Sequence, residues 1–116
     1  MGDKMSDEMT DAKILERLFT TIENRKGMDP ETSWTAKLFS EGRAKIVQKV
    51  GEEAVEVNIA ALVESPDNLA AESADLLYHL LVLWADAGLT PKDIWAKLAE
   101  REGTSGIVEK NARTDQ

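Results

Sequence analysis

Carboxylate side chains occur in two groups within sequence that is otherwise rich in apolar residues. Glu52, Glu53 and Glu56 form the first group, and Glu72 and Asp75 form the second. Spacings of three and four residues place helical side chains on one face, so the acids of each group converge. Carboxylates held together repel one another unless a cation lies between them, and oxygen ligands suit a hard ion such as Mg²⁺. The sequence therefore predicts a divalent metal site that handles a phosphate ester.

Either acidic group alone is weak evidence, because glutamate favours helices and a charged run is usually a solvated face. The two groups together are stronger, since a short connection at Ser65-Pro66 makes their helices antiparallel neighbours. Three basic residues precede the first group: Arg43, Lys45 and Lys49. They are candidates for phosphate contacts, and the alternative for Lys49 is a surface pair with Glu53, one turn later.

The single histidine and the aromatic residues allow two interpretations each. His79 lies on an apolar helix, where a hydrogen-bonded structural role is the more common one and a ligand or substrate contact is the other. Aromatic side chains in helical proteins mostly fill a core or an interface, although they also stack on bases. Trp34 falls in an expected loop and is the best stacking candidate, ahead of Tyr78, Trp84 and Trp95.

Apolar periodicity and capping residues predict an all-α fold. The first helix should follow a cap at Thr10 or Asp11 and stop before Gly27. Further helices are expected over about 35–39, 43–63, 66–87 and 91–102. Glu53 lies inside the apolar stripe of the 43–63 helix, which also has a second apolar face formed by Val55, Ile59 and Leu62. That helix should therefore pack on two sides.

Composition limits the possible functions of these 116 residues. A net charge of -8 argues against a nucleic-acid surface, and the absence of cysteine excludes disulfides and thiolate chemistry. Residues 1–10 are polar and are expected to be a disordered lead without the apolar region of a signal peptide, followed by one domain over 11–103 and a tail over 104–116. The longest apolar run, 76–85, is too short for a membrane span, so a cytoplasmic protein is expected.

Four stretches of the chain resemble the phosphoribosyl-ATP pyrophosphatase family of histidine biosynthesis. The first two are Lys49–Glu56 (KVGEEAVE) and Glu72–Leu81 (ESADLLYHLL). The resemblance extends upstream through Ser33–Leu38, where the family usually has tyrosine in place of Trp34, and downstream through 105–113. It covers about nine-tenths of the 116 residues. The paired acidic motifs are shared with the wider superfamily of all-α nucleoside triphosphate pyrophosphatases, so the flanking segments carry the expected substrate.

The resemblance implies Mg²⁺-dependent hydrolysis of phosphoribosyl-ATP to phosphoribosyl-AMP and pyrophosphate. It also implies a four-helix bundle-like subunit in an intertwined homodimer, with the active site near the interface. The expected roles are as follows: metal ligands Glu53, Glu56, Glu72 and Asp75; catalytic Glu53 and Glu52, the latter a base or a further ligand; substrate contacts Trp34, Arg43, Lys49, His79, Lys110 and Arg113.

Two other functions remain compatible with the same residues. A housecleaning pyrophosphatase acting on dUTP or damaged nucleotides would need the same carboxylates. A non-catalytic dimeric helical adaptor would carry them as a charged groove. A di-iron bundle is disfavoured, because such sites use Glu-x-x-His on two helices and no glutamate lies three residues before His79.

Overall fold

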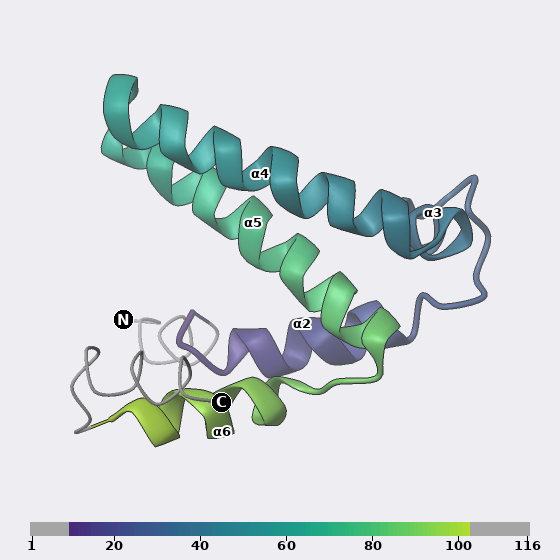
Figure 1. The fold of residues 1–116 in the computed structure, drawn as a ribbon. Coiled ribbons are helices and arrows are strands. Elements are labelled where there is room, and N and C mark those ends of the chain that lie inside the picture. Colours follow the sequence, from purple (N-terminus) through teal and green to yellow (C-terminus); the bar gives the residue numbers. More distant parts are fainter. Residues whose placement is uncertain (1–9, 103–116) are drawn as a thin grey trace, which may run out of the picture.

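The computed structural model describes residues 10–102, and these residues form five helices and no strand. The helices are α2 (Ile14–Glu23), α3 (Trp34–Glu41), α4 (Arg43–Val63), α5 (Pro66–Ala87) and α6 (Pro91–Arg101). The all-α expectation is confirmed for this part of the chain. Figure 1 shows α4 and α5 as the two longest helices, lying side by side as a hairpin.

Local signals in the sequence fix the ends of the last two helices. Ser65 is the N-cap of α5, where its Oγ accepts a hydrogen bond from the Asn68 backbone N–H at 3.1 Å, and Pro66 takes the first helical position. Gly88 ends α5 in the left-handed conformation, with φ of 79°. At α6 the Asp93 carboxylate accepts from the Thr90 backbone N–H at 2.8 Å. These two helices therefore begin where the sequence predicts.

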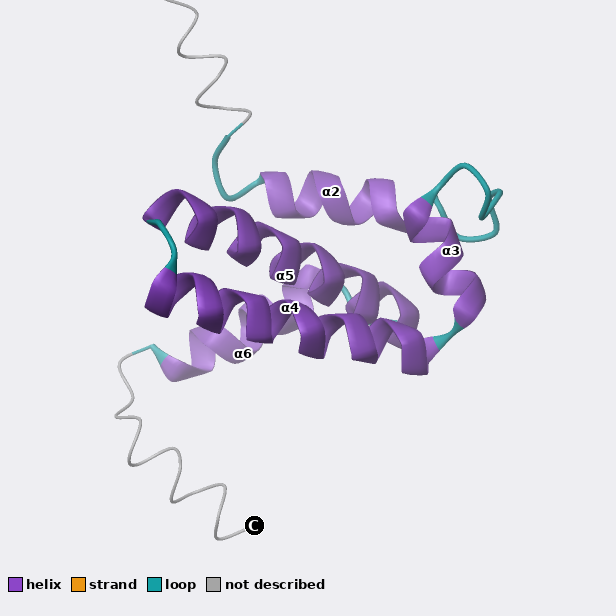
Figure 2. Cartoon of the chain, turned by 90° about the horizontal axis from the view of Figure 1, so that it is seen from above, coloured by secondary structure: helices purple, strands orange, loops and turns teal. Residues whose placement is uncertain are grey.

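The buried core lies at one end of the α4–α5 hairpin. Ile46 of α4 and Leu81 and Val82 of α5 are fully buried there. Phe19 and Ile22 of α2 join them, and α3 adds Leu38. Figures 1 and 2 show that the tip of the hairpin, around residues 63–66, extends beyond α2. The half of α4 and α5 near this tip therefore packs mainly on its hairpin partner.

Two sequence-based predictions about the helix starts are wrong. Helix α2 begins at Ile14 with Lys13 as its N-cap, because Asp11 instead forms a turn, its Oδ1 accepting from the Lys13 N–H at 2.9 Å. Helix α3 is longer than expected and Trp34 is its first residue rather than part of a loop. The N-cap of α3 is Ser33, whose Oγ accepts from the Ala36 N–H at 3.1 Å.

Two segments expected from the sequence lie outside the described residues. They are the N-terminal lead, of which only Thr10 is described, and the tail over 104–116. The proposed substrate contacts Lys110 and Arg113 fall in that tail. Among the described helices, none is long and apolar enough to cross a membrane.

Candidate metal centre

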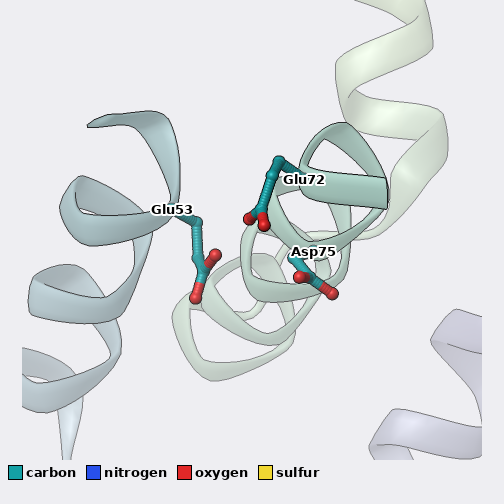
Figure 3. Close-up of side chains that lie close together, drawn as sticks. All are labelled: Glu53, Glu72 and Asp75. Carbon is teal, nitrogen blue, oxygen red and sulfur yellow. The ribbon is translucent and has the colours of Figure 1, made fainter. Parts of the chain in front are cut away.

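Three of the predicted metal ligands meet between α4 and α5. Glu53 projects from α4 toward Glu72 and Asp75 on α5 (Figure 3), and one carboxylate oxygen of each lies within 4.8 Å of the others. We call these three residues the acid cluster. The antiparallel pairing of the two helices brings the residues together, because position 53 on α4 lies level with positions 72–75 on α5. Oxygen atoms at such separations are close enough to share one divalent cation.

The electrostatics of the acid cluster are those of crowded like charges. The pKa of Glu72 is raised, first by desolvation and then by the negative charges of Asp75, Glu56 and Glu53. A raised carboxylate pKa means that the ionised form is disfavoured in this setting. A cation bound at the acid cluster would reverse this effect, which is the behaviour expected of metal ligands.

The remaining two predicted acids stand apart from the acid cluster. Glu56 is outside the group, although its charge contributes to the raised pKa of Glu72. Glu52 is exposed and bonds to its own helix, accepting from Gln48 Nε2 at 3.2 Å and pairing with Lys49 Nζ at 3.1 Å. These two hydrogen bonds lower the pKa of Glu52, so its carboxylate stays ionised. It is adjacent to the acid cluster without being part of it.

Lys49 connects the acid cluster to the start of α3. Its Nζ lies 3.7 Å from Glu53 Oε1 and 5.8 Å from the centroid of the Trp34 ring. The hydrogen bond to Glu52 and the nearby Glu52 and Glu53 charges raise the Lys49 pKa against the opposing effect of desolvation. The surface-pair interpretation of Lys49 is therefore realised, and its ammonium lies at the edge of the acid cluster.

His79 is buried and both of its ring nitrogens are engaged by the protein. Nδ1 lies 2.8 Å from the Asp75 carbonyl oxygen, and Trp34 Nε1 lies 3.4 Å from Nε2. Beside this pair, the hydroxyl groups of Tyr78 and Thr35 form a hydrogen bond. The structural role that sequence analysis favoured for His79 is the one that these contacts support. The Thr35–Tyr78 contact spans 43 residues and no local sequence signal indicates it.

Arg43 lies away from the acid cluster in this chain. Its guanidinium pairs with the Asp86 carboxylate, and its Nη2 donates to the Asp86 carbonyl oxygen at 3.1 Å. Ten residues separate Arg43 from Glu53 along α4, which corresponds to about 15 Å along a helix axis. Arg43 therefore joins the start of α4 to the end of α5.

The other aromatic side chains have structural contacts. Trp84 and Trp95 pack edge to face with ring centroids 6.3 Å apart, and Trp95 Nε1 donates to Glu16 Oε1 at 3.0 Å. A polar cavity of about 520 Å³ lies at the start of α3, and Trp34 contributes to its wall. Its other lining residues are Pro30, Glu31, Thr32, Ser33, Lys37, Ser40 and Glu41. Trp34 is thus the one aromatic residue placed beside both a cavity and, through Lys49, the acid cluster.

The described residues thus define an all-α protein in which the two helices of a hairpin supply carboxylates to one cluster that could hold a metal ion. The model of the phosphoribosyl-ATP pyrophosphohydrolase family matches residues 15–102, which include the whole acid cluster. The chain belongs to this family.

Curated relatives support this assignment over most of the chain. A phosphoribosyl-ATP pyrophosphatase of Azospirillum brasilense is 63% identical over 109 residues, covering 94% of this chain and 98% of the relative. One from Paramagnetospirillum magneticum is 64% identical over 103 residues, covering 89% and 94%. Another, from Rhodospirillum rubrum, is 64% identical over 101 residues, covering 87% and 86%.

Proposed function

We propose that this protein hydrolyses phosphoribosyl-ATP to phosphoribosyl-AMP and pyrophosphate, the second step of histidine biosynthesis. Its family membership and its relatives, named phosphoribosyl-ATP pyrophosphatases, support this activity. The observation that carries the proposal is the meeting of Glu53, Glu72 and Asp75 between two helices. Such an acid cluster has no evident structural benefit, because like charges at this distance destabilise the fold.

Mg²⁺ is the cation that we propose for the acid cluster. The donor set fits, since it consists of carboxylate oxygens alone, and desolvation together with the neighbouring negative charges raises the pKa of Glu72. Glu53, Glu72 and Asp75 would hold the ion, and Glu56, whose charge reaches Glu72, is proposed as a further ligand. When bound, Mg²⁺ supplies charge neutralisation at phosphate oxygens and a lowered pKa for a bound water.

The residues around the acid cluster have distinct proposed tasks. Lys49 contacts the substrate phosphates, because its ammonium lies 3.7 Å from Glu53 Oε1 and is a cation at the edge of the acid cluster. Glu52 is the base that orients the attacking water or a further metal ligand, and its lowered pKa keeps the carboxylate ionised, as either role requires. Trp34 stacks on the purine base, since it lines the adjacent cavity.

The decisive experiment is pyrophosphate release from phosphoribosyl-ATP with and without Mg²⁺, in the wild-type protein and in Glu53→Gln and Asp75→Asn. Each substitution should lower kcat by more than about a hundredfold, because even outer-shell groups of metal sites cost ten- to a hundredfold. Asp67→Asn, in the first turn of the same α5 helix, is the matched control and should retain activity. Full activity of either cluster variant would refute the assignment.

The same assay separates the other two functions. Faster hydrolysis of dUTP or another nucleoside triphosphate than of phosphoribosyl-ATP would indicate a housecleaning enzyme. A calorimetric Mg²⁺ titration addresses the adaptor, because a scaffold should show no site that depends on Asp75. The cytoplasm is the compartment that we propose, since a cysteine-free biosynthetic enzyme suits a reducing environment.

We also propose that the chain forms a homodimer in which two α4–α5 hairpins complete a four-helix bundle. The second apolar face of α4 is exposed in the single chain: Val55 is 54% exposed, Ile59 41% and Leu62 83%. Spacings of four and three residues align these side chains in one stripe. Leu77 on α5 is also exposed. Soluble monomers rarely leave such a stripe uncovered, which favours a partner surface of the same kind.

A further inference from the structure

Two neighbouring residues at the start of α3 are hydrogen-bonded to two neighbouring residues of α5. Trp34 Nε1 donates to His79 Nε2 at 3.4 Å, and Thr35 bonds to the Tyr78 hydroxyl. Thr35 is 4% exposed and His79 7%. The two pairs therefore connect the start of α3 to α5, and each pair contains one buried residue.

The chemistry of the partners determines the protonation of the His79 ring. An indole N–H is only a donor, so Nε2 must accept from Trp34 and carries no proton. Nδ1 then carries the proton and donates to the Asp75 carbonyl oxygen at 2.8 Å. Both ring nitrogens are used within the protein, which leaves neither for a direct bond to a substrate.

This arrangement places Trp34 against two residues, His79 and Lys49, that each lie one helical turn from a member of the acid cluster. On α5, His79 follows Asp75 by four residues; on α4, Lys49 precedes Glu53 by four. The Trp34 ring lies 6.5 Å from the His79 ring and 5.8 Å from Lys49 Nζ, measured from its centroid. It is still 45% exposed and forms part of the cavity wall. An indole in this position has a partly free surface close to where phosphates would bind.

We infer that His79 is a positioning residue that fixes the Trp34 indole as the stacking wall of a purine subsite beside the acid cluster. The inference rests on the proposed function for the identity of the substrate. Stacking of a base on an aromatic ring is sensitive to ring orientation, and the free indole has two side-chain rotations to lose on binding. The hydrogen bond to His79 removes that freedom in advance. His79 acts through Trp34 and touches no substrate atom.

The indole N–H resonances of the three tryptophans provide a direct test. In ¹⁵N-labelled protein, the Trp34 cross-peak is assigned by its loss in Trp34→Phe. His79→Leu should move this peak, because the acceptor is gone, while His79→Gln retains an acceptor oxygen and should restore part of the shift. Addition of AMP, used as the purine probe, should shift the Trp34 peak in the wild-type protein and bind more weakly in His79→Leu.

Steady-state kinetics give the functional arm. His79→Leu should raise the KM for phosphoribosyl-ATP about threefold to tenfold, the value of one hydrogen bond, with little change in kcat. Trp34→Phe should do the same, and the double variant should resemble Trp34→Phe alone, because both changes remove one interaction. Multiplied effects in the double variant would show a direct substrate contact and overturn the inference. If His79→Leu does not fold, an unchanged KM in Trp34→Phe overturns it equally.

The proposed function and this inference fail in different ways. A wild-type protein without activity on phosphoribosyl-ATP would refute the proposed function, while the response of the Trp34 peak to AMP would still test the purine subsite. If the protein is active but the Trp34 cross-peak shifts neither with AMP nor with the His79 substitutions, only the positioning role of His79 is refuted.

Discussion

Replacement of Asp75 by asparagine should make the metal-free protein more stable, although it removes a functional group. The carboxylate oxygens of Asp75 and Glu53 lie within 4.8 Å of each other. Two unit charges at that separation repel by about 0.9 kcal/mol in water, and salt at physiological strength reduces this to about 0.5 kcal/mol. Glu72 adds a repulsion in the same direction. For a chain of this size, 0.5 kcal/mol corresponds to a rise in Tm of about 2 °C.

The sign of this difference should reverse when Mg²⁺ is added. A ligand that binds only the folded state at a hundred times its Kd stabilises it by about 2.7 kcal/mol, and Asp75→Asn should lose most of that gain. Differential scanning calorimetry in EDTA and in excess Mg²⁺, at equal protein concentration, measures both effects.

The control for this experiment is Asp67→Asn, which removes the same charge from the first turn of α5. It should lower the Tm slightly in EDTA, because a negative charge near a helix N-terminus is favourable, and it should respond to Mg²⁺ like the wild-type protein. An Asp75→Asn variant that is less stable than the wild-type protein in EDTA, or equally stabilised by Mg²⁺, would refute the electrostatic reasoning.

Three further predictions concern pH, the α4–α5 contact and assembly. Because the Glu72 pKa is raised in the folded protein, the metal-free protein should lose stability as the pH rises from the ordinary glutamate pKa through the raised one. Over the same pH range the affinity for Mg²⁺ should increase. Urea unfolding measures the stability and calorimetry the affinity, and Glu72→Gln should flatten both pH profiles. Arg43→Met should lower the free energy of unfolding by less than about 1 kcal/mol through loss of the exposed pair with Asp86, and leave KM unchanged; a large rise in KM would place Arg43 in the substrate site. Ile59→Glu should shift the sedimentation equilibrium toward monomer, whereas Ala96→Glu on α6 should not; equal dimer stability in both variants would exclude the α4 face as the interface.

Much of the fold could be predicted from the sequence because its signals are local. The Ser65-Pro66 cap and the glycine at position 88 each act within one or two helical turns, and the structure confirms them. Of the expected apolar stripe on α4, Ile46 and Ala60 are buried, whereas Val47 is half exposed. The start of α2 was missed because Lys13, which carries no capping oxygen, occupies the N-cap. A turn formed by a side chain two residues earlier leaves little trace in the hydrophobic pattern.

The candidate site was predictable only in part, since its members meet through packing. The acid cluster followed from helical spacing and from the short connection between α4 and α5. Glu56 shares a helix face with Glu53 by spacing but lies outside the cluster, which spacing alone does not reveal. The hydrogen bond between Trp34 and His79 joins residues 45 positions apart, and the pairing of Arg43 with Asp86 joins residues 43 apart. No sequence pattern encodes such contacts.

The position of the core at one end of the hairpin affects how the protein loses its activity when it begins to unfold. Glu53 and Glu72 are not part of the buried core cluster, whose members on the hairpin are Ile46 of α4 and residues 81–85 of α5, so few buried apolar contacts oppose local opening beside them. Fraying there would part the two carboxylates while the opposite end stays folded. On mild warming, enzymatic activity should therefore decline before the helicity measured by circular dichroism does. An unchanged circular dichroism spectrum then does not show that a preparation is active.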